Sequence, residues 1–146
     1  MECKNGKTLY CREAEEKVLR AFLSWQTDDV KLTVRDRVAI HMDGTAYYYL
    51  WGTELVHRDV YGDISIYITD ESGMDYKFYG PGGRRKKVAM TETTKNRLNV
   101  FLQYYGFNKL EVHSMKKLFG VWHNGMELKN NTWYVLDRET KNLIEL

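Results

Sequence analysis

Residues 37–51, RVAIHMDGTAYYYLW, contain the pattern on which the fold prediction rests. The apolar residues 38, 40 and 42 alternate with residues 37, 39 and 41, and then Asp43-Gly44 supplies a dipeptide that favours a tight hairpin turn. After the turn, Tyr47, Tyr49 and Trp51 share one face of the predicted return strand. The stretch therefore predicts an antiparallel hairpin whose second strand is rich in aromatic side chains.

The same period of two recurs further along the chain. Ile64, Ile66 and Ile68 alternate with Asp63, Ser65 and Tyr67, which predicts a strand over residues 62–69 with its isoleucines facing inward. Shorter runs predict strands at residues 55–58, 75–79, 110–115, 118–122, 126–129, 132–136 and 143–144. A glycine-rich break at residues 80–83 and turns at 124–125 and 130–131 separate them.

Two segments instead show the helical period. The first spans residues 12–25, with its apolar stripe at Ala14, Val18, Phe22 and Trp25. The second begins at a threonine between residues 91 and 94 and ends at Gly106, with its stripe at Leu98, Phe101, Leu102 and Tyr105. Because βαβ alternation is missing, the sequence predicts an α+β fold: an antiparallel sheet of hairpins and meanders with two helices, in a single domain over residues 1–146.

Composition limits the possible classes of protein. The chain has 146 residues, 43% of them hydrophobic, which is enough for one core. Its 22 basic and 20 acidic residues nearly balance, so a binding partner has to be selected by local features of the surface. We expect a cytoplasmic protein without membrane contact, since no run of eighteen apolar residues and no apolar leader is present. Cys3 and Cys11 are expected to be free thiols.

The strongest local signal is electrostatic. Residues 80–97 contain six basic residues and one acidic residue, whereas residues 54–75 contain six acidic residues and one arginine. The predicted binding residues are the six basic ones: Arg84, Arg85, Lys86, Lys87, Lys95 and Arg97. Beside Gly82-Gly83 and a helix start they indicate phosphate contact, although a solvated charged loop is the alternative interpretation. The tyrosine strand likewise predicts either base stacking or ordinary core packing.

The evidence for an enzyme is thin. Glu127 and Lys129 match the Glu-x-Lys half of a metal-dependent nuclease site, a pattern that is common by chance. His57 and Asp59 share a strand face and have the chemistry of a base with its orienting carboxylate, but the sequence links no nucleophile to them. We predict no catalytic residues, no metal site and no cofactor.

The segment Thr91-Glu92-Thr93-Thr94-Lys95-Asn96-Arg97-Leu98-Asn99 resembles a Thr-Thr-Lys/Arg-x-Arg-Leu-Asn stretch found in small uncharacterised proteins encoded by bacteriophages. In those proteins the stretch follows a short strand pair and precedes a helix that ends in glycine. The resemblance implies a phage accessory protein that acts by binding to a host macromolecule in the host cytoplasm.

Three hypotheses follow. The first is a non-enzymatic binding protein of phage type that engages a host or phage protein, for example as an inhibitor of a defence or replication factor. The alternative is a nucleic-acid-binding protein that uses the basic residues between 84 and 97. The second alternative is a metal-dependent nuclease built around Glu127 and Lys129.

Overall fold

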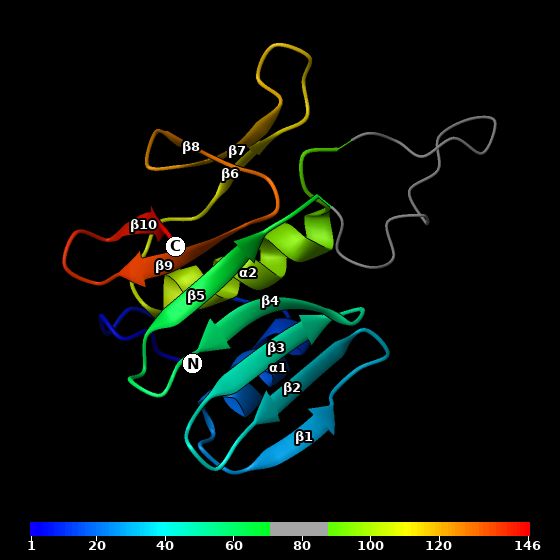
Figure 1. Cartoon of the computed structure of the whole chain (residues 1–146), viewed down its shortest axis with the longest axis vertical. Coiled ribbons are helices and arrows are strands. Elements are labelled where there is room, and N and C mark those ends of the chain that lie inside the picture. Colours follow the sequence, from blue (N-terminus) through cyan, green and yellow to red (C-terminus); the bar gives the residue numbers. More distant parts are fainter. Residues whose placement is uncertain (71–87) are drawn as a thin grey trace.

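The computed structural model describes residues 1–70 and 88–146, and these contain two helices and ten strands. The helices are α1 (Glu13–Leu23) and α2 (Glu92–Tyr104). The strands are β1 (Asp28–Lys31), β2 (Asp36–Ile40), β3 (Ala46–Leu50), β4 (Thr53–Arg58), β5 (Ile64–Ile68), β6 (Glu111–His113), β7 (Gly120–His123), β8 (Met126–Leu128), β9 (Thr132–Asp137) and β10 (Asn142–Glu145). The predicted α+β class is confirmed (Figure 1).

Seven strands form one antiparallel sheet in the order β1-β2-β3-β4-β5-β9-β10. The first five follow one another as a meander, and the predicted hairpin around Asp43-Gly44 joins β2 to β3. The next neighbour of β5 is β9, which begins more than sixty residues later in the chain. The intervening segment supplies α2 and a separate three-stranded sheet, β6-β7-β8. Strands adjacent in the sequence therefore pair throughout the large sheet, except where β5 pairs with β9.

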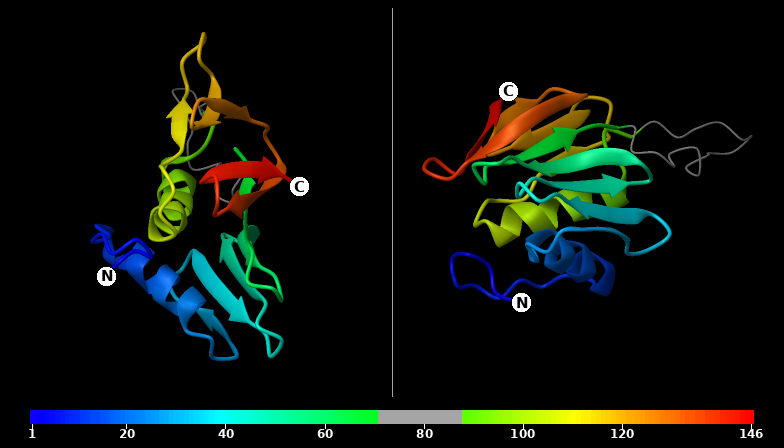
Figure 2. Two further views of the ribbon diagram at one scale, coloured as in Figure 1. Left: turned by 90° about the vertical axis from the view of Figure 1, so that its left-hand side faces the viewer. Right: turned by 60° about the horizontal axis from the view of Figure 1, so that its bottom comes forward.

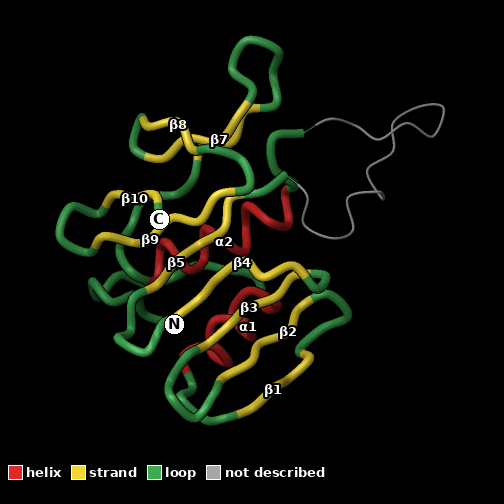
Figure 3. The backbone as a smooth tube through the Cα atoms, viewed as in Figure 1, coloured by secondary structure: helices red, strands yellow, loops and turns green. Residues whose placement is uncertain are grey.

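Both helices pack against the same face of the large sheet, behind its strands in the view of Figure 3 and to one side of them in Figure 2. Alternation along the strands sends the predicted isoleucines of β5 to this face, where all three are buried. On α2 the predicted stripe is buried as well, and the rings of Phe22 and Phe101 meet edge to face at 5.0 Å between centroids. The core thus lies between the sheet and the two helices.

The end of α1 differs from the prediction. The helix stops at Leu23, and Trp25 follows in the left-handed region with φ of 61° and a side chain 64% exposed. Its indole covers the guanidinium of Arg58, 3.8 Å from the ring centroid. Arg58 is itself buried and donates to the carbonyl oxygens of Gly44 and Phe22, each at 3.0 Å. A cation at the carbonyl end of α1 complements the helix dipole, so Trp25 shields a polar cap and does not extend the apolar stripe.

Two sequence predictions lie outside the described residues: the strand at 75–79 and the glycine-rich break at 80–83. The strands predicted after residue 110 are present, with slightly different bounds. Neither described helix combines the length and apolar character needed to cross a membrane.

Candidate functional site

The open face of the large sheet, the face opposite the two helices, carries a row of aromatic rings. Tyr47 on β3 stands beside His57 on β4, and Tyr67 on β5 stands beside Trp133 on β9. Ring centroids are 4.8 Å apart for Tyr47 and His57, 6.5 Å for His57 and Trp133, and 5.1 Å for Tyr67 and Trp133. All four rings are part-exposed, so they form one contiguous surface across four neighbouring strands.

Tyr49, two residues after Tyr47 on β3, continues this aromatic row along the strand. Its ring stacks on that of Tyr47 at 6.4 Å, and the guanidinium of Arg37 lies 4.5 Å from its centroid. Burial and the nearby charge of Glu54 raise the pKa of Tyr49, so its phenol is neutral at physiological pH. Tyr47 and Tyr49 share one face of the return strand, as predicted, whereas β3 ends at Leu50 and Trp51 follows it in the left-handed region with φ of 51°. Tyr67 and Trp133 were not predicted to join the tyrosines, because only the β5 to β9 pairing brings them alongside.

The polar side chains beside the aromatic row contact one another. Arg37 forms a salt bridge with Asp29 at 3.0 Å, and His57 Nδ1 lies 3.4 Å from Glu54. Asp59, the orienting carboxylate predicted for His57, instead accepts hydrogen bonds from the backbone N–H groups of Tyr61 and Asp63. The open face therefore offers rings and the ion pair of Arg37 with Asp29, with no assembled base and nucleophile among these residues.

The six predicted binding residues do not come together as one described site. Arg84, Arg85, Lys86 and Lys87 lie outside the described residues. Lys95 is part-exposed and pairs with Glu92 at 2.9 Å. As a phosphate contact in a basic surface patch Arg97 would lie exposed, but it is buried, with only 5% of its surface exposed. The reason is its position directly before Leu98 and one turn before Phe101, which turns it toward the sheet.

Arg97 is buried because Asp36 needs a counterion. Asp36 is fully buried on β2 and receives two hydrogen bonds from Arg97, at 2.9 and 3.1 Å. Tyr48 and Thr33 donate their hydroxyls to the same carboxylate. Burial alone raises the pKa of Asp36, but these hydrogen bonds and the charge of Arg97 outweigh it and hold the pKa below its ordinary value. The buried pair joins α2 to the sheet.

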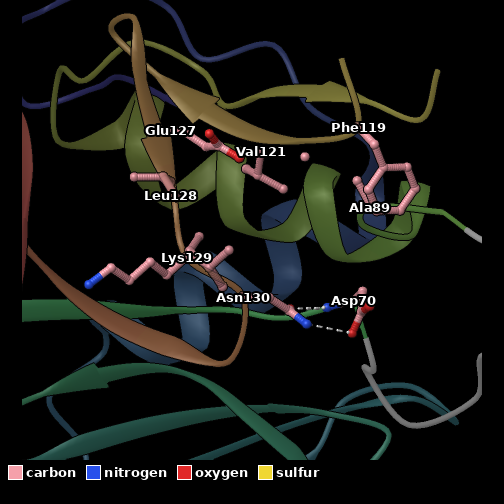
Figure 4. Close-up of a pocket in the computed structure, with 10 residues that line it drawn as sticks. Asp70, Ala89, Phe119, Val121, Glu127, Leu128, Lys129 and Asn130 are labelled. Carbon is pink, nitrogen blue, oxygen red and sulfur yellow. Dashed lines mark hydrogen bonds between the residues drawn. The ribbon is translucent and has the colours of Figure 1, made fainter. Parts of the chain in front are cut away.

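A hollow of about 560 Å³ lies between the end of β5 and the small sheet (Figure 4). Apolar side chains, among them Val121 and Leu128, line much of it, and Glu127 and Asp70 lie on its rim. Figure 4 shows the amine of Lys129 pointing away from Glu127, and its Nζ lies 3.1 Å from Glu145. Asp70 accepts a hydrogen bond from Asn130 at 3.1 Å. The Glu-x-Lys pattern is therefore not assembled into a joint site by these residues.

No three histidine, cysteine, aspartate or glutamate side chains within residues 1–70 and 88–146 are grouped as metal ligands. Comparisons with known proteins return no match: no family model, no curated protein and no solved structure is similar to the chain. The feature that points to a function is therefore the aromatic row on the open face of the large sheet.

Proposed function

We propose that the protein is a non-enzymatic binding protein that docks another protein on the open face of its large sheet. The observation that carries the proposal is the row formed by Tyr47, Tyr49, His57, Tyr67 and Trp133. Tyrosine, tryptophan and arginine are the residue types most enriched at the centres of protein interfaces, and this face presents all three. In keeping with the resemblance to phage proteins, we propose a host or phage protein as the partner.

Charge favours a protein over a nucleic acid as the occupant. Phosphate backbones are bound by unpaired cations, whereas Arg37 on this face already pairs with Asp29. Ala39, next to Tyr47 on the neighbouring strand, and Ser65, next to His57, are small and buried, so the rings form a raised surface suited to packing against another surface. Charged groups at the border of such a surface fix the orientation of a bound partner and disfavour wrong partners.

The experiment compares two tagged variants of the full chain in capture from bacterial lysate at low salt. The Tyr47→Ala/Trp133→Ala variant removes the centre of the aromatic row, and Tyr10→Ala, in the exposed segment before α1, serves as the aromatic control. We expect one partner to be retained by the wild type and by Tyr10→Ala and lost by the double variant. With the purified partner, amide hydrogen exchange should then slow in β3, β5 and β9. Equal retention by the double variant, or no partner at all, would refute the proposal.

A nucleic-acid function remains the second candidate because aromatic rings also stack with bases and the sequence places four cations at residues 84–87. Changing Arg84, Arg85, Lys86 and Lys87 together to alanine separates the two functions. Binding to single-stranded DNA that weakens steeply with salt and disappears in this variant identifies nucleic acid as the ligand. Protein capture that survives the same change supports the open face.

A further inference from the structure

A second hollow lies where the turn between β1 and β2 meets the first turns of α1 and α2. It has a volume of about 220 Å³. Its walls contain Arg12, Thr33, Arg35, Thr93, Asn96 and Arg97, together with Ala14 and Val34. Three of these eight residues are arginines and none is acidic. Since bulk water occupies about 30 Å³ per molecule, the hollow has room for a small polyatomic ion with some of its water.

The buried member of this group has a donor to spare. Arg97 uses Nε and Nη2 to bind Asp36, and Nη1 donates no hydrogen bond to any residue in the described part of the chain. Nη1 is also absent from the fully buried unpartnered atoms, which among described residues are Arg58 Nη2 and His123 Nδ1, so it keeps contact with solvent. Arg97 lines the hollow, and Nη1 is the one guanidinium nitrogen that has no hydrogen-bond partner among the described residues.

The other two arginines lack carboxylate partners. Within residues 1–70 and 88–146, neither Arg12 nor Arg35 forms a salt bridge. Of the acids in the first turn of α1, Glu13 pairs with Lys17 and Glu16 with Arg20, whereas Glu15 accepts a hydrogen bond from the backbone N–H of Arg12 and has no cationic partner among the described residues. Asp36 offsets the charge of Arg97, and Glu15, whose charge also acts on Arg97, offsets that of a second arginine, so one net positive charge remains around the hollow.

We propose that this hollow binds the phosphate group of a small phosphorylated molecule. A phosphate monoester carries a charge of about −1.5 to −2 near neutral pH, and it is attracted to a hollow whose walls contain three guanidinium groups and no carboxylate. Arginine forks bind phosphate oxygens through paired hydrogen bonds, and the Thr93 hydroxyl and Asn96 amide add neutral donors to the same walls. The two hydrogen bonds to Asp36 fix the orientation of the Arg97 guanidinium, so this group is already positioned before the ligand binds.

The test measures thermal unfolding and binding heat of the full chain with inorganic phosphate, a nucleoside 5′-monophosphate and the unphosphorylated nucleoside, against sodium chloride at equal ionic strength. We expect both phosphate-bearing compounds to raise the unfolding midpoint in a saturable way, and the nucleoside and chloride not to. Tighter binding of the monophosphate than of inorganic phosphate identifies the ester as the ligand, and equal binding identifies free phosphate.

Arg35→Gln and Arg12→Gln change exposed side chains and so leave the fold intact, and each should weaken phosphate binding by about tenfold. Arg20→Gln, on the same helix but outside the hollow, removes the same charge and should bind phosphate as the wild type does. Equal midpoints in phosphate and chloride, or equal affinity of all three variants, would overturn the proposal.

Discussion

Three consecutive tyrosines of β3 show how differently the two faces of the sheet are built. Tyr48 points to the helix side, is fully buried and donates its hydroxyl to Asp36. Tyr47 and Tyr49 point to the open face, stay part-exposed and contact neighbouring rings and Arg37. On the covered face a tyrosine contributes to stability through a satisfied polar network, whereas on the open face the same residue type leaves surface available to a partner. Under the proposed function, stability and recognition are divided between adjacent residues of one strand.

Removing the buried charge should produce the largest difference between the faces. Asp36→Asn leaves Arg97 buried without a counterion, and we expect the free energy of unfolding to fall by about 3–5 kcal/mol. The matched control is Asp29→Asn, which breaks the exposed pair with Arg37 and should cost less than about 1 kcal/mol. Urea denaturation followed by circular dichroism measures both. Similar losses for the two variants would show that the covered face does not depend on its ion pair.

Removing one hydroxyl from each face tests the comparison at adjacent positions. Tyr48→Phe deletes a hydrogen bond to a buried carboxylate and should cost about 1.5–3 kcal/mol. Tyr47→Phe deletes a hydroxyl on the open face and should stay within about 0.5 kcal/mol of the wild type. The shift in urea midpoint is measured for both variants. A larger shift for Tyr47→Phe than for Tyr48→Phe would contradict the prediction.

Acid should weaken the covered face selectively. The pKa of Asp36 is lower in the folded protein than in the unfolded chain, so the unfolded state takes up a proton first as pH falls. The contribution of Asp36 is therefore complete above its ordinary unfolded pKa of about 3.9 and is lost as pH drops below this value through the folded pKa. Unfolding free energies measured from pH 7 to pH 2 should decline in this window. In Asp36→Asn the decline should be smaller, and an identical pH profile would contradict the assignment.

The contacts within the aromatic row should be the weakest of all. A double-mutant cycle with Tyr47→Ala and His57→Ala is expected to give a coupling energy of about 0.2–1 kcal/mol, as for other cross-strand pairs. Unfolding of the two single variants and the double variant supplies the value. A coupling as large as that of Asp36 with Arg97 would mean that the rings serve stability and are not held ready for a partner.

The elements that sequence alone predicts are those defined by local periodicity. The hairpin around Asp43-Gly44, the isoleucines of β5 and the stripe of α2 all follow from spacing within about fifteen residues. β1 escaped prediction because Asp28–Lys31 contains a single apolar residue. At the end of α1, the aromatic character of Trp25 suggested burial, but Arg58 provides an exposed stacking position for it.

Only part of the candidate site could be predicted from the sequence, for a different reason. The positions of Tyr47 and Tyr49 follow from alternation, whereas Trp133 joins them through a strand pairing that no local pattern specifies. The ion pair of Arg97 with Asp36 joins residues 61 positions apart, and a charged residue within a polar run favours an exposed interpretation until its partner is known. Burial of charge is decided by tertiary contacts, which lie beyond the reach of periodicity.

The pairing of β5 with β9 has a consequence for how the chain folds. The β5 to β9 pair forms only after residues separated by more than sixty positions meet, so a large loop has to lose its freedom before those hydrogen bonds form. The β1 to β5 meander consists of short-range contacts and is able to assemble early, which would leave the edge of β5 unpaired until the C-terminal strands arrive. We therefore expect slow folding for a chain of this size, with a transient species that tends to aggregate through that edge.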